Sequence, residues 1–279
     1  MTSWCSTPAL TPDERLEVLD LFNRTEIELA REAIDEGRRR TVVHRGVGEH
    51  WLDLAGGHVR RYALLNEGEP ASVEMCGGGF DASLLASILA RRETVDWWTR
   101  GEHETHGGTV VRTLHLLRVA LPVTLDHAGA PIGEVRTFDP DRDAHAWLAQ
   151  NNAAFADHPE QGAWTERQLE ERLREPWFDP SGFFLLELDG RLAASCWTKV
   201  HELHPDRFGE IYVVAVHPDF RGRGLGRMMV LHGLDALRRK GVTSATLFVD
   251  ESNAPARALY ESLGFTLERA DSLIRFSAT

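Results

Sequence analysis

The segment "YVVAVHPDFRGRGLGRMMVLHGL", residues 212–234, passes from a strand pattern to a helix pattern through a turn rich in arginine and glycine. The β-branched run up to Val216 predicts a strand, and the apolar spacing after Gly226 predicts a helix. Glycines let backbone N–H groups approach a ligand, and the first turn of a helix carries partial positive charge. Residues 221–227 therefore predict an anion site, although a solvated basic turn would contain the same residue types.

Composition narrows the class of protein. The 279 residues suffice for two compact domains or one large one, and 42% hydrophobic with 27% charged residues is typical of a soluble globular protein. A formal net charge of -12 argues against nucleic acid as a partner. No apolar run has the length of a membrane span, the first ten residues do not resemble a signal peptide, and three scattered cysteines suit a reducing compartment. We expect a cytoplasmic monomer that binds small molecules and has no metal, membrane or nucleic-acid partner.

The chain contains a weak internal repeat. Residues 137–155, "TFDPDRDAHAWLAQNNAAF", match residues 9–27, "ALTPDERLEVLDLFNRTEI", at an offset of 128. In the earlier copy, Thr11 with Glu14 predicts a capping box at the start of a helix. Near the ends of the two halves, residues 112–118 match residues 269–275 at an offset of 157. The first half therefore lacks 29 residues somewhere inside. A tandem repeat predicts two domains, residues 1–126 and 135–279, with a boundary at the turn-rich stretch 127–134.

The second half has a readable order of elements. Thr165 with Gln168 predicts a helix start, Asp189-Gly190 a hairpin turn between two strands, and Asn253 the start of a short helix that ends at Gly264. Strands and helices alternate, with hairpins as well as crossovers. The expected fold class is α/β (α+β), with mixed central sheets flanked by helices.

The arginine-glycine turn has a specific spacing. A dinucleotide fingerprint would need glycine in place of Arg227, and a P-loop would need a Gly-Lys-Ser/Thr triplet that the chain lacks. The pattern is Arg221-x-x-Gly224-x-Gly226, preceded by "EIYVVAVHP" and followed by "NAPARALYESLGF". This combination resembles the acetyl-CoA pyrophosphate loop of the GCN5-related N-acetyltransferases (GNATs).

The resemblance implies a tandem GNAT protein whose first half is degenerate. At the place of a second acetyl-CoA loop the chain reads "ASVEMCGGGFDASLLASIL", without the arginine-glycine spacing. We expect that residues 1–126 do not bind acetyl-CoA, and that Gly77-Gly78-Gly79 is a flexible turn because no arginine accompanies it in the sequence. Loss of the loop and adjoining segments would explain the missing residues.

The resemblance assigns acetyl-CoA to three segments of the second half. Backbone groups of a strand would hold the pantetheine arm like an added strand, with one N–H facing the thioester oxygen. The turn would wrap the pyrophosphate, and the start of the next helix would supply further contacts. The residues are Val214, Ala215 and Val216, then Arg221, Gly222, Arg223, Gly224, Leu225, Gly226 and Arg227, and finally Asn253, Ala254, Pro255, Ala256, Arg257 and Ala258.

Two residues are candidates for catalysis by the same resemblance. Glu210 opens the strand that leads to the turn, and it would serve as base or bind the substrate; the alternative is a solvated edge carboxylate. Tyr260 matches the tyrosine that many of these enzymes use to protonate the departing thiolate; the alternative is a buried structural tyrosine.

The motifs "NNAAFADHPEQGAWT" and "WTKVH" are similar to those of GNATs that acetylate the cysteinyl amine of a cysteinyl-glucosaminyl-inositol. That likeness points to acceptor contacts at Glu160, Lys199 and Glu210, and to Glu49 in the first half. Phe248 stands where we expect tyrosine in many relatives, so a hydrogen bond to the acceptor is in doubt there. Each charged residue could equally be a surface charge.

Other patterns are interpreted as structural. The His201–His204 and His103–His106 pairs lack a third metal ligand, so we expect loops there. The tryptophans are expected to pack in the core or line a cleft. Two further functions stay open: acetylation of another amine, on a small molecule or a protein, and a non-catalytic acyl-CoA-binding module.

Overall fold

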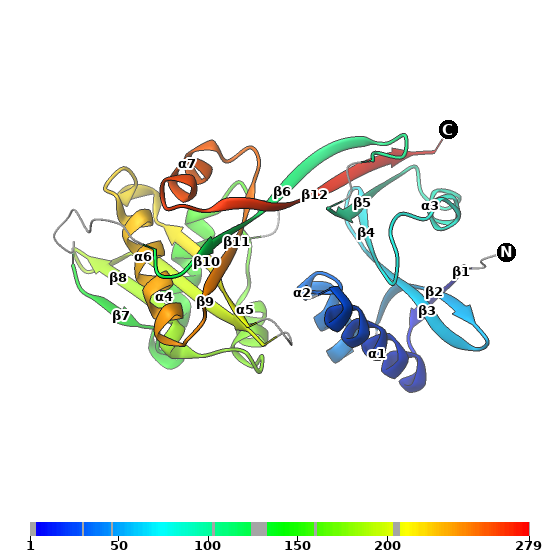
Figure 1. Cartoon of the computed structure of the whole chain (residues 1–279), viewed down its shortest axis with the longest axis horizontal. Helices are drawn as coiled ribbons and strands as arrows, with labels where there is room; N and C mark the ends of the chain where they lie inside the picture. The colour runs from blue at the N-terminus through cyan, green and yellow to red at the C-terminus, as the bar shows by residue number, and fades with distance from the viewer. Residues whose placement is uncertain are drawn as a thin grey trace.

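The computed structural model describes residues 4–29, 31–45, 47–101, 104–123, 133–158, 161–202 and 207–278. These residues form a single 12-stranded sheet in the order β1-β2-β3-β4-β5-β12-β6-β11-β10-β9-β8-β7. Figure 1 shows two lobes, one from each half of the chain, joined by the long strands β6 and β12. The mixed sheet flanked by helices confirms the predicted fold class.

The first half contributes strands and helices to one lobe. They are β1 (Trp4–Ala9), α1 (Pro12–Leu29), α2 (Glu36–Arg40), a π-helical turn (Thr41–Arg45), β2 (Val47–Ala55), β3 (His58–Asn66), β4 (Ala71–Cys76), α3 (Ala82–Leu89), β5 (Thr94–Arg100) and β6 (Thr109–Ala120). The predicted start of α1 is confirmed, because Glu14 accepts hydrogen bonds from the Thr11 backbone and hydroxyl.

The second half forms the other lobe. Its elements are β7 (Val135–Thr137), α4 (Pro140–Ala154), α5 (Glu166–Leu173), a 3-10 turn (Pro180–Gly182), β8 (Phe183–Leu188), β9 (Arg191–His201), β10 (Phe208–Val216), a 3-10 turn (Pro218–Phe220), α6 (Leu225–Arg239), β11 (Ser244–Asp250), α7 (Ala254–Ser262) and β12 (Thr266–Ser277). The capping box at Thr165 is present, and Asp189 and Gly190 both have positive φ in the hairpin turn, as the sequence predicts.

The last strand of each half reaches the sheet of the other. β12 pairs with β5 on one side and β6 on the other, and β6 also pairs with β11. Leu114 of β6 lies opposite Asp271 of β12, which is the residue that the repeat offset of 157 assigns to it. The two halves therefore meet at a local two-fold relation between equivalent strands.

The boundary between the halves stays a prediction. Most of the proposed linker, residues 127–132, lies outside the described residues. The pairing of β6 with β12 couples the proposed domains 1–126 and 135–279 through backbone hydrogen bonds.

Helices cover both faces of the second lobe. α6 packs on one face through Met229, Leu234 and Leu237, which are almost fully buried. α4 and α5 pack on the other face around Trp147 and Leu169. Burial of these apolar side chains is the main stabilisation of the lobe. Of the described helices, none has the length and apolar character needed to cross a membrane.

β10 and β11 separate in the middle of the sheet. A register shift between Ile211 and Val213 marks a bulge in β10. The parallel ladder between β10 and β11 contains only the pairs Gly209–Ala245 and Glu210–Thr246, although both strands continue for several residues. Bulges bend strands and end pairing next to active sites. The separation leaves backbone groups of β10 available to another extended chain.

The equivalent strands of the first half stay together for longer. β4 and β5 pair at four positions, from Ala71–Val95 to Glu74–Trp98. The helix that follows the glycine run, α3, has 8 residues, whereas α6 has 15. The described residues between β5 and β6, 101 and 104–108, contain no helix, whereas α7 stands between β11 and β12. These shortenings account for much of the length that the repeat lacks.

Candidate active site

The separated part of β10 carries the predicted pantetheine segment. Val214, Ala215 and Val216 pair with β9 along one edge, and the β10–β11 ladder has ended before them. The side chains of Val214 and Val216 are half-buried in the core that contains α6, and Ala215 is buried. Their backbone, rather than their side chains, is thus suited to hold a ligand.

The arginine-glycine turn leads directly into α6. Gly222 and Gly224 both have φ of 76°, a conformation that side chains disfavour, and a Cβ atom at either position would meet open space. Gly224 is the N-cap residue of α6, and it provides no side chain to cap the first turn. The turn therefore leaves the start of a 15-residue helix open to an anion.

The arginines of the turn tie it to neighbouring helices. Arg221 Nη2 donates to the carbonyl oxygen of Ala154 at the end of α4, at 2.8 Å. Arg227 Nη1 donates to Ser262 Oγ at the end of α7, also at 2.8 Å. The Arg223 guanidinium lies 5.2 Å from the centre of the Phe220 ring. These contacts fix the turn in space; Arg221 and Arg223 are exposed, and Arg227 is half-buried.

α7 lies beside the turn. Asn253 Oδ1 accepts a hydrogen bond from the Ala256 N–H at 3.2 Å, so it is the predicted cap. A Cβ atom on Gly226 would touch Leu259 of α7 and Val216 of β10 at 3.6 and 3.7 Å, so the three elements converge there. Tyr260 points into the core and is 7% exposed, and burial raises the pKa of its hydroxyl.

A cleft of about 720 Å³ lies between the two halves. Its walls carry many charged groups of both signs and the aromatic ring of Trp177. The lining residues include Glu26, Glu32, Glu36, Arg39 and Arg40 from the first half, and Glu175, Trp177, Lys199, His201, Arg207 and Lys240 from the second. Such a volume suits a small organic ligand, and the polar walls suit one with hydroxyl groups and a charge.

Lys199 links the halves inside this cleft. Its Nζ lies 3.1 Å from Glu32 Oε1 and 3.2 Å from Glu36 Oε2. Its ammonium also lies 4.8 Å from the centre of the Trp177 ring. Burial alone would lower the pKa of Lys199, but the two glutamates outweigh it and raise that pKa. Lys199 is therefore a permanently charged group in the cleft wall.

Glu210 is the neighbour of Lys199 across β9 and β10. Its side chain is largely buried, and Oε2 lies 2.5 Å from Nε2 of His201. The expectation of a loop at His201 is wrong, because this residue ends β9 and packs on Phe208 with ring centres 4.6 Å apart. Of the other histidines in those pairs, His106 stacks on Phe80, and 103 and 204 lie outside the described residues.

Of the predicted acceptor residues, Glu49 and Phe248 do not line this cleft. Glu49 on β2 forms an ion pair with Arg92 at 2.6 Å and does not line the cleft between the halves. Phe248 on β11 is 43% exposed, just past the end of the β10–β11 ladder. Glu160 falls outside the described residues. Sequence reasoning missed Glu32, Glu36 and His201, and only the "WTKVH" motif could have indicated the last of them.

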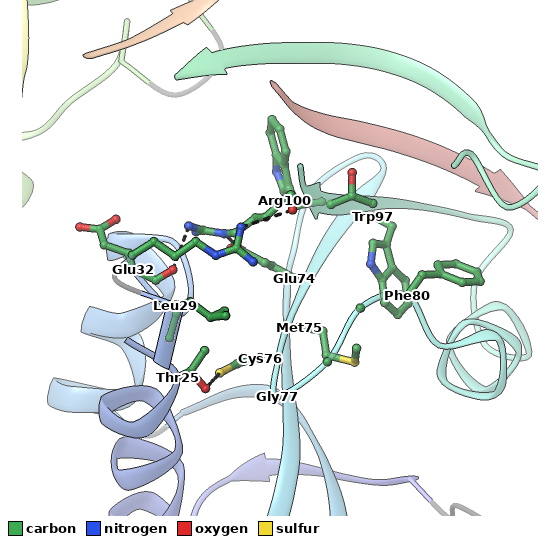
Figure 2. A pocket seen from close by; sticks show the side chains of 16 residues that line it. Thr25, Leu29, Glu32, Glu74, Met75, Cys76, Gly77, Phe80, Trp97 and Arg100 are labelled. Carbon is green, nitrogen blue, oxygen red and sulfur yellow. Dashed lines mark hydrogen bonds and ion pairs between the residues drawn. The ribbon is translucent and has the colours of Figure 1, made fainter. Parts of the chain in front are cut away.

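A smaller pocket lies in the first half at the position equivalent to the opening beside β10. It encloses about 150 Å³ between α1, β4 and β5, and includes Gly77–Gly79. Figure 2 shows Arg100 beside Glu74 and Glu32 at one end of it, and Trp97 and Phe80 at the other. No arginine stands near the glycine run in the sequence, as we noted. In the folded protein, however, Arg31 and Arg100 line the same pocket as these glycines. Arg100 Nε bonds Glu74, so its charge is neutralised.

Comparison with known proteins agrees with this geometry. The Acetyltransferase (GNAT) family matches residues 131–265. A mycothiol acetyltransferase of Thermomonospora curvata is 58% identical over 82% of this chain and 83% of its own length. The fold matches a GCN5-related N-acetyltransferase of Sphaerobacter thermophilus with a TM-score of 0.68, 21% identity, and coverage of 98% of this chain and 95% of that one. It also matches a tandem GNAT protein from the clavulanic acid biosynthesis pathway, with a TM-score of 0.65, 18% identity, and coverage of 100% and 98%.

Proposed function

The chain belongs to the mycothiol acetyltransferase family of GNAT acetyltransferases, and we propose that it transfers an acetyl group from acetyl-CoA to the cysteinyl α-amine of cysteinyl-glucosaminyl-inositol. This reaction is the last step of mycothiol biosynthesis. The observation that carries the proposal is the opening between β10 and β11, which lies between the arginine-glycine turn and the charged cleft. An acyl donor held in the opening can meet an amine held in the cleft.

Acetyl-CoA fits the segments that the sequence assigns to it. The uncapped start of α6 and the glycines at positive φ suit the pyrophosphate, and Arg221 to Arg227 supply positive charge. The free edge of Val214 to Val216 suits the pantetheine amides. A backbone N–H of this segment would stabilise the negative charge that develops on the thioester oxygen. Asn253 to Ala258 complete the site as the adjoining helix start.

The cleft supplies groups of the kind the acceptor needs. Glu32 and Glu36 present carboxylates to a cationic amine, and Lys199 offers a fixed donor to hydroxyl oxygens. Glu210, beside Lys199, contributes the carboxylate that takes part in deprotonation or binds the amine. Because Glu32 and Glu36 come from the first half, that half completes the acceptor site.

Tyr260 is proposed to assist the departing thiolate. A tyrosine stays protonated at neutral pH, and burial strengthens that tendency by raising its pKa. The thiol reference pKa, about 8.5, is lower than that of tyrosine, about 10, so full proton transfer to the thiolate is uphill. Tyr260 therefore acts chiefly as a hydrogen-bond donor to the developing negative charge.

The first half is proposed to bind no acetyl-CoA. Ligand pockets for organic molecules are commonly ~300–1,000 Å³, and the equivalent pocket here has about 150 Å³. The longer β4–β5 ladder and the short α3 support the same conclusion.

The deciding experiment is an acetyl transfer assay with acetyl-CoA and a panel of amines, which follows the release of free thiol. We expect the cysteinyl-glucosaminyl-inositol to be acetylated with the highest kcat/KM. If the protein acetylates a different amine and not cysteinyl-glucosaminyl-inositol, that amine becomes the assigned acceptor. Binding of coenzyme A without turnover of any amine would favour a non-catalytic acyl-CoA module.

A further inference from the structure

His201 and Glu210 form a buried acid–imidazole pair. Nε2 of His201 and Oε2 of Glu210 are 2.5 Å apart, and both side chains are largely inaccessible to solvent. The imidazole stacks on Phe208 with ring planes 13° apart, so its orientation is fixed. A carboxylate accepts a hydrogen bond and cannot donate one, so Nε2 carries the hydrogen, and in the neutral imidazole Nδ1 carries the lone pair.

The two members of the pair differ in their access to the acceptor cleft. His201 lines the cleft, whereas Glu210 lies behind it. Nδ1 of His201 lies 3.9 Å from Glu32 Oε1, which exceeds hydrogen-bond length. A donor N–H group placed beside both atoms could contact each of them. The geometry of lone pair and carboxylate is therefore suited to a substrate ammonium.

We infer that His201 is the catalytic base for the acceptor amine, and that Glu210 acts through it as a positioning residue. Nδ1 takes one proton from the ammonium, and the nitrogen lone pair so released forms the C–N bond at the thioester carbon. The C–S bond then breaks, and coenzyme A leaves as the thiolate that Tyr260 stabilises. The second proton, which the new amide nitrogen loses, neutralises that thiolate. The imidazolium keeps its Nε2–H on Glu210, whose charge stabilises it, as in other acid–imidazole dyads. The proton then leaves to water in the cleft. This assignment rests on the proposed function and gives the proton a definite first acceptor.

The charged surroundings bear on the pH dependence of this base. Glu210 on β10 and Glu32 before α2 both face the imidazole. Lys199 pairs with Glu32 and with Glu36, and the Arg100 guanidinium donates to the backbone carbonyl oxygen of Glu32. The negative charges of Glu210 and Glu32 attract the imidazolium that forms during the reaction.

The test compares His201→Gln with wild type from pH 6.5 to 9, with His145→Gln as the control. His145 is a highly exposed histidine on α4 that is not part of the cleft lining. General-base catalysis is worth about 10²–10⁴-fold, so we expect kcat/KM of His201→Gln at pH 7 to fall about 100-fold. The loss should shrink to about tenfold at pH 9, because the α-amine, with a reference pKa of about 7.7–8.0, is then already neutral. Added imidazole should restore part of the activity at pH 7.

Other outcomes would overturn the assignment. If kcat/KM of His201→Gln falls by the same factor at every pH and added imidazole restores none of it, the role of His201 is structural only. Near-normal activity of His201→Gln, together with an inactive Glu210→Gln, would make Glu210 itself the base. Calorimetry with coenzyme A and the melting temperature check that each variant is folded. If the wild-type protein acetylates no amine at all, the proposed function itself is wrong. That result differs from the outcomes that refute only the role of His201.

Discussion

Lys199 of β9 and Glu32 of the first half, 167 residues apart in sequence, lie with Nζ 3.1 Å from Oε1 across the cleft between the lobes. Glu36 provides a second carboxylate to the same ammonium. Together with the β6–β12 pairing, this contact fixes how the halves face each other. The cleft that we propose as the acceptor site is thus built from both halves.

Replacing Lys199 by Met should weaken both stability and acceptor binding. The variant keeps the apolar stem over Trp177 but leaves two carboxylates close together without their cation. Because Glu32 stays partly exposed, we expect a loss of about 2 kcal/mol in the free energy of unfolding, below the range for fully buried pairs. The acceptor KM should rise about tenfold, and the affinity for coenzyme A should not change. Urea unfolding and steady-state kinetics measure these quantities, and unchanged values in both would refute the role of this ion pair.

Glu36 and Glu49 give a direct comparison of two first-half carboxylates. Glu36 lines the cleft and contacts Lys199, whereas Glu49 is paired with Arg92 outside it. Glu36→Gln should raise the acceptor KM severalfold, since a charge-assisted hydrogen bond is replaced by a neutral one. Glu49→Gln should leave it within about twofold, because a half-exposed ion pair contributes little. The reverse order would restore the assignment of Glu49 that the sequence suggested.

Gly224 tests the cofactor turn. Valine there must adopt a left-handed conformation at the N-cap of α6, which costs about 1–2 kcal/mol per residue. We expect the Kd for coenzyme A, measured by calorimetry, to rise at least tenfold. Gly57→Val is the matched control, because its φ of 87° is also left-handed, a Cβ atom there would meet open space, and it lies in the turn between β2 and β3 of the first half. If both variants bind coenzyme A as wild type does, the turn does not hold the pyrophosphate.

The sequence was informative where the structure is local. The caps at Thr11, Thr165 and Asn253 and the Asp189-Gly190 turn depend on neighbours within a few residues, and all are present. The bulge in β10 and the early end of its ladder with β11 depend on the tertiary fit of the sheet. Residue types along one strand do not encode them.

The residues of the proposed acceptor cleft could not be predicted from local sequence patterns, for a related reason. Glu32 and Glu36 follow α1 in a stretch without a motif, and they meet Lys199 only because β6 and β12 bring the lobes together. Glu49, to which the family resemblance pointed, forms an ion pair with Arg92 within its own lobe. His201 looked like part of a loop because the pattern of histidines was compared only with metal sites.

The lowered pKa of Asp81 leads to a prediction of how the stability of the first half changes in acid. Asp81 caps α3 and pairs with Arg61 at 2.6 Å. Burial opposes its charge, but hydrogen bonds from Ser83, Leu84 and Arg61 outweigh burial and lower its pKa to about 2. A folded pKa below the unfolded one stabilises the fold above about pH 4, and that stabilisation is lost as pH falls towards 2. We expect Asp81→Asn to cost about 2 kcal/mol at pH 7 and roughly half as much at pH 3, as measured by urea unfolding. An equal cost at both pH values would show that the charge of Asp81 is irrelevant.

Tyr260→Phe separates a catalytic hydroxyl from a structural ring. The phenylalanine keeps the packing against Phe265 at a 5.8 Å ring distance and removes only the hydroxyl. We expect kcat to fall about tenfold or more, because the thiolate loses a hydrogen bond made as charge develops, while the Kd for coenzyme A stays within twofold. Burial raises the pKa of Tyr260, so the hydroxyl stays protonated and the rate loss should be the same from pH 6.5 to 9. Single-turnover kinetics with the acceptor measure the chemical step directly. An unchanged rate would assign Tyr260 to the core alone, and the departing thiolate would then need another donor from the opening beside β10.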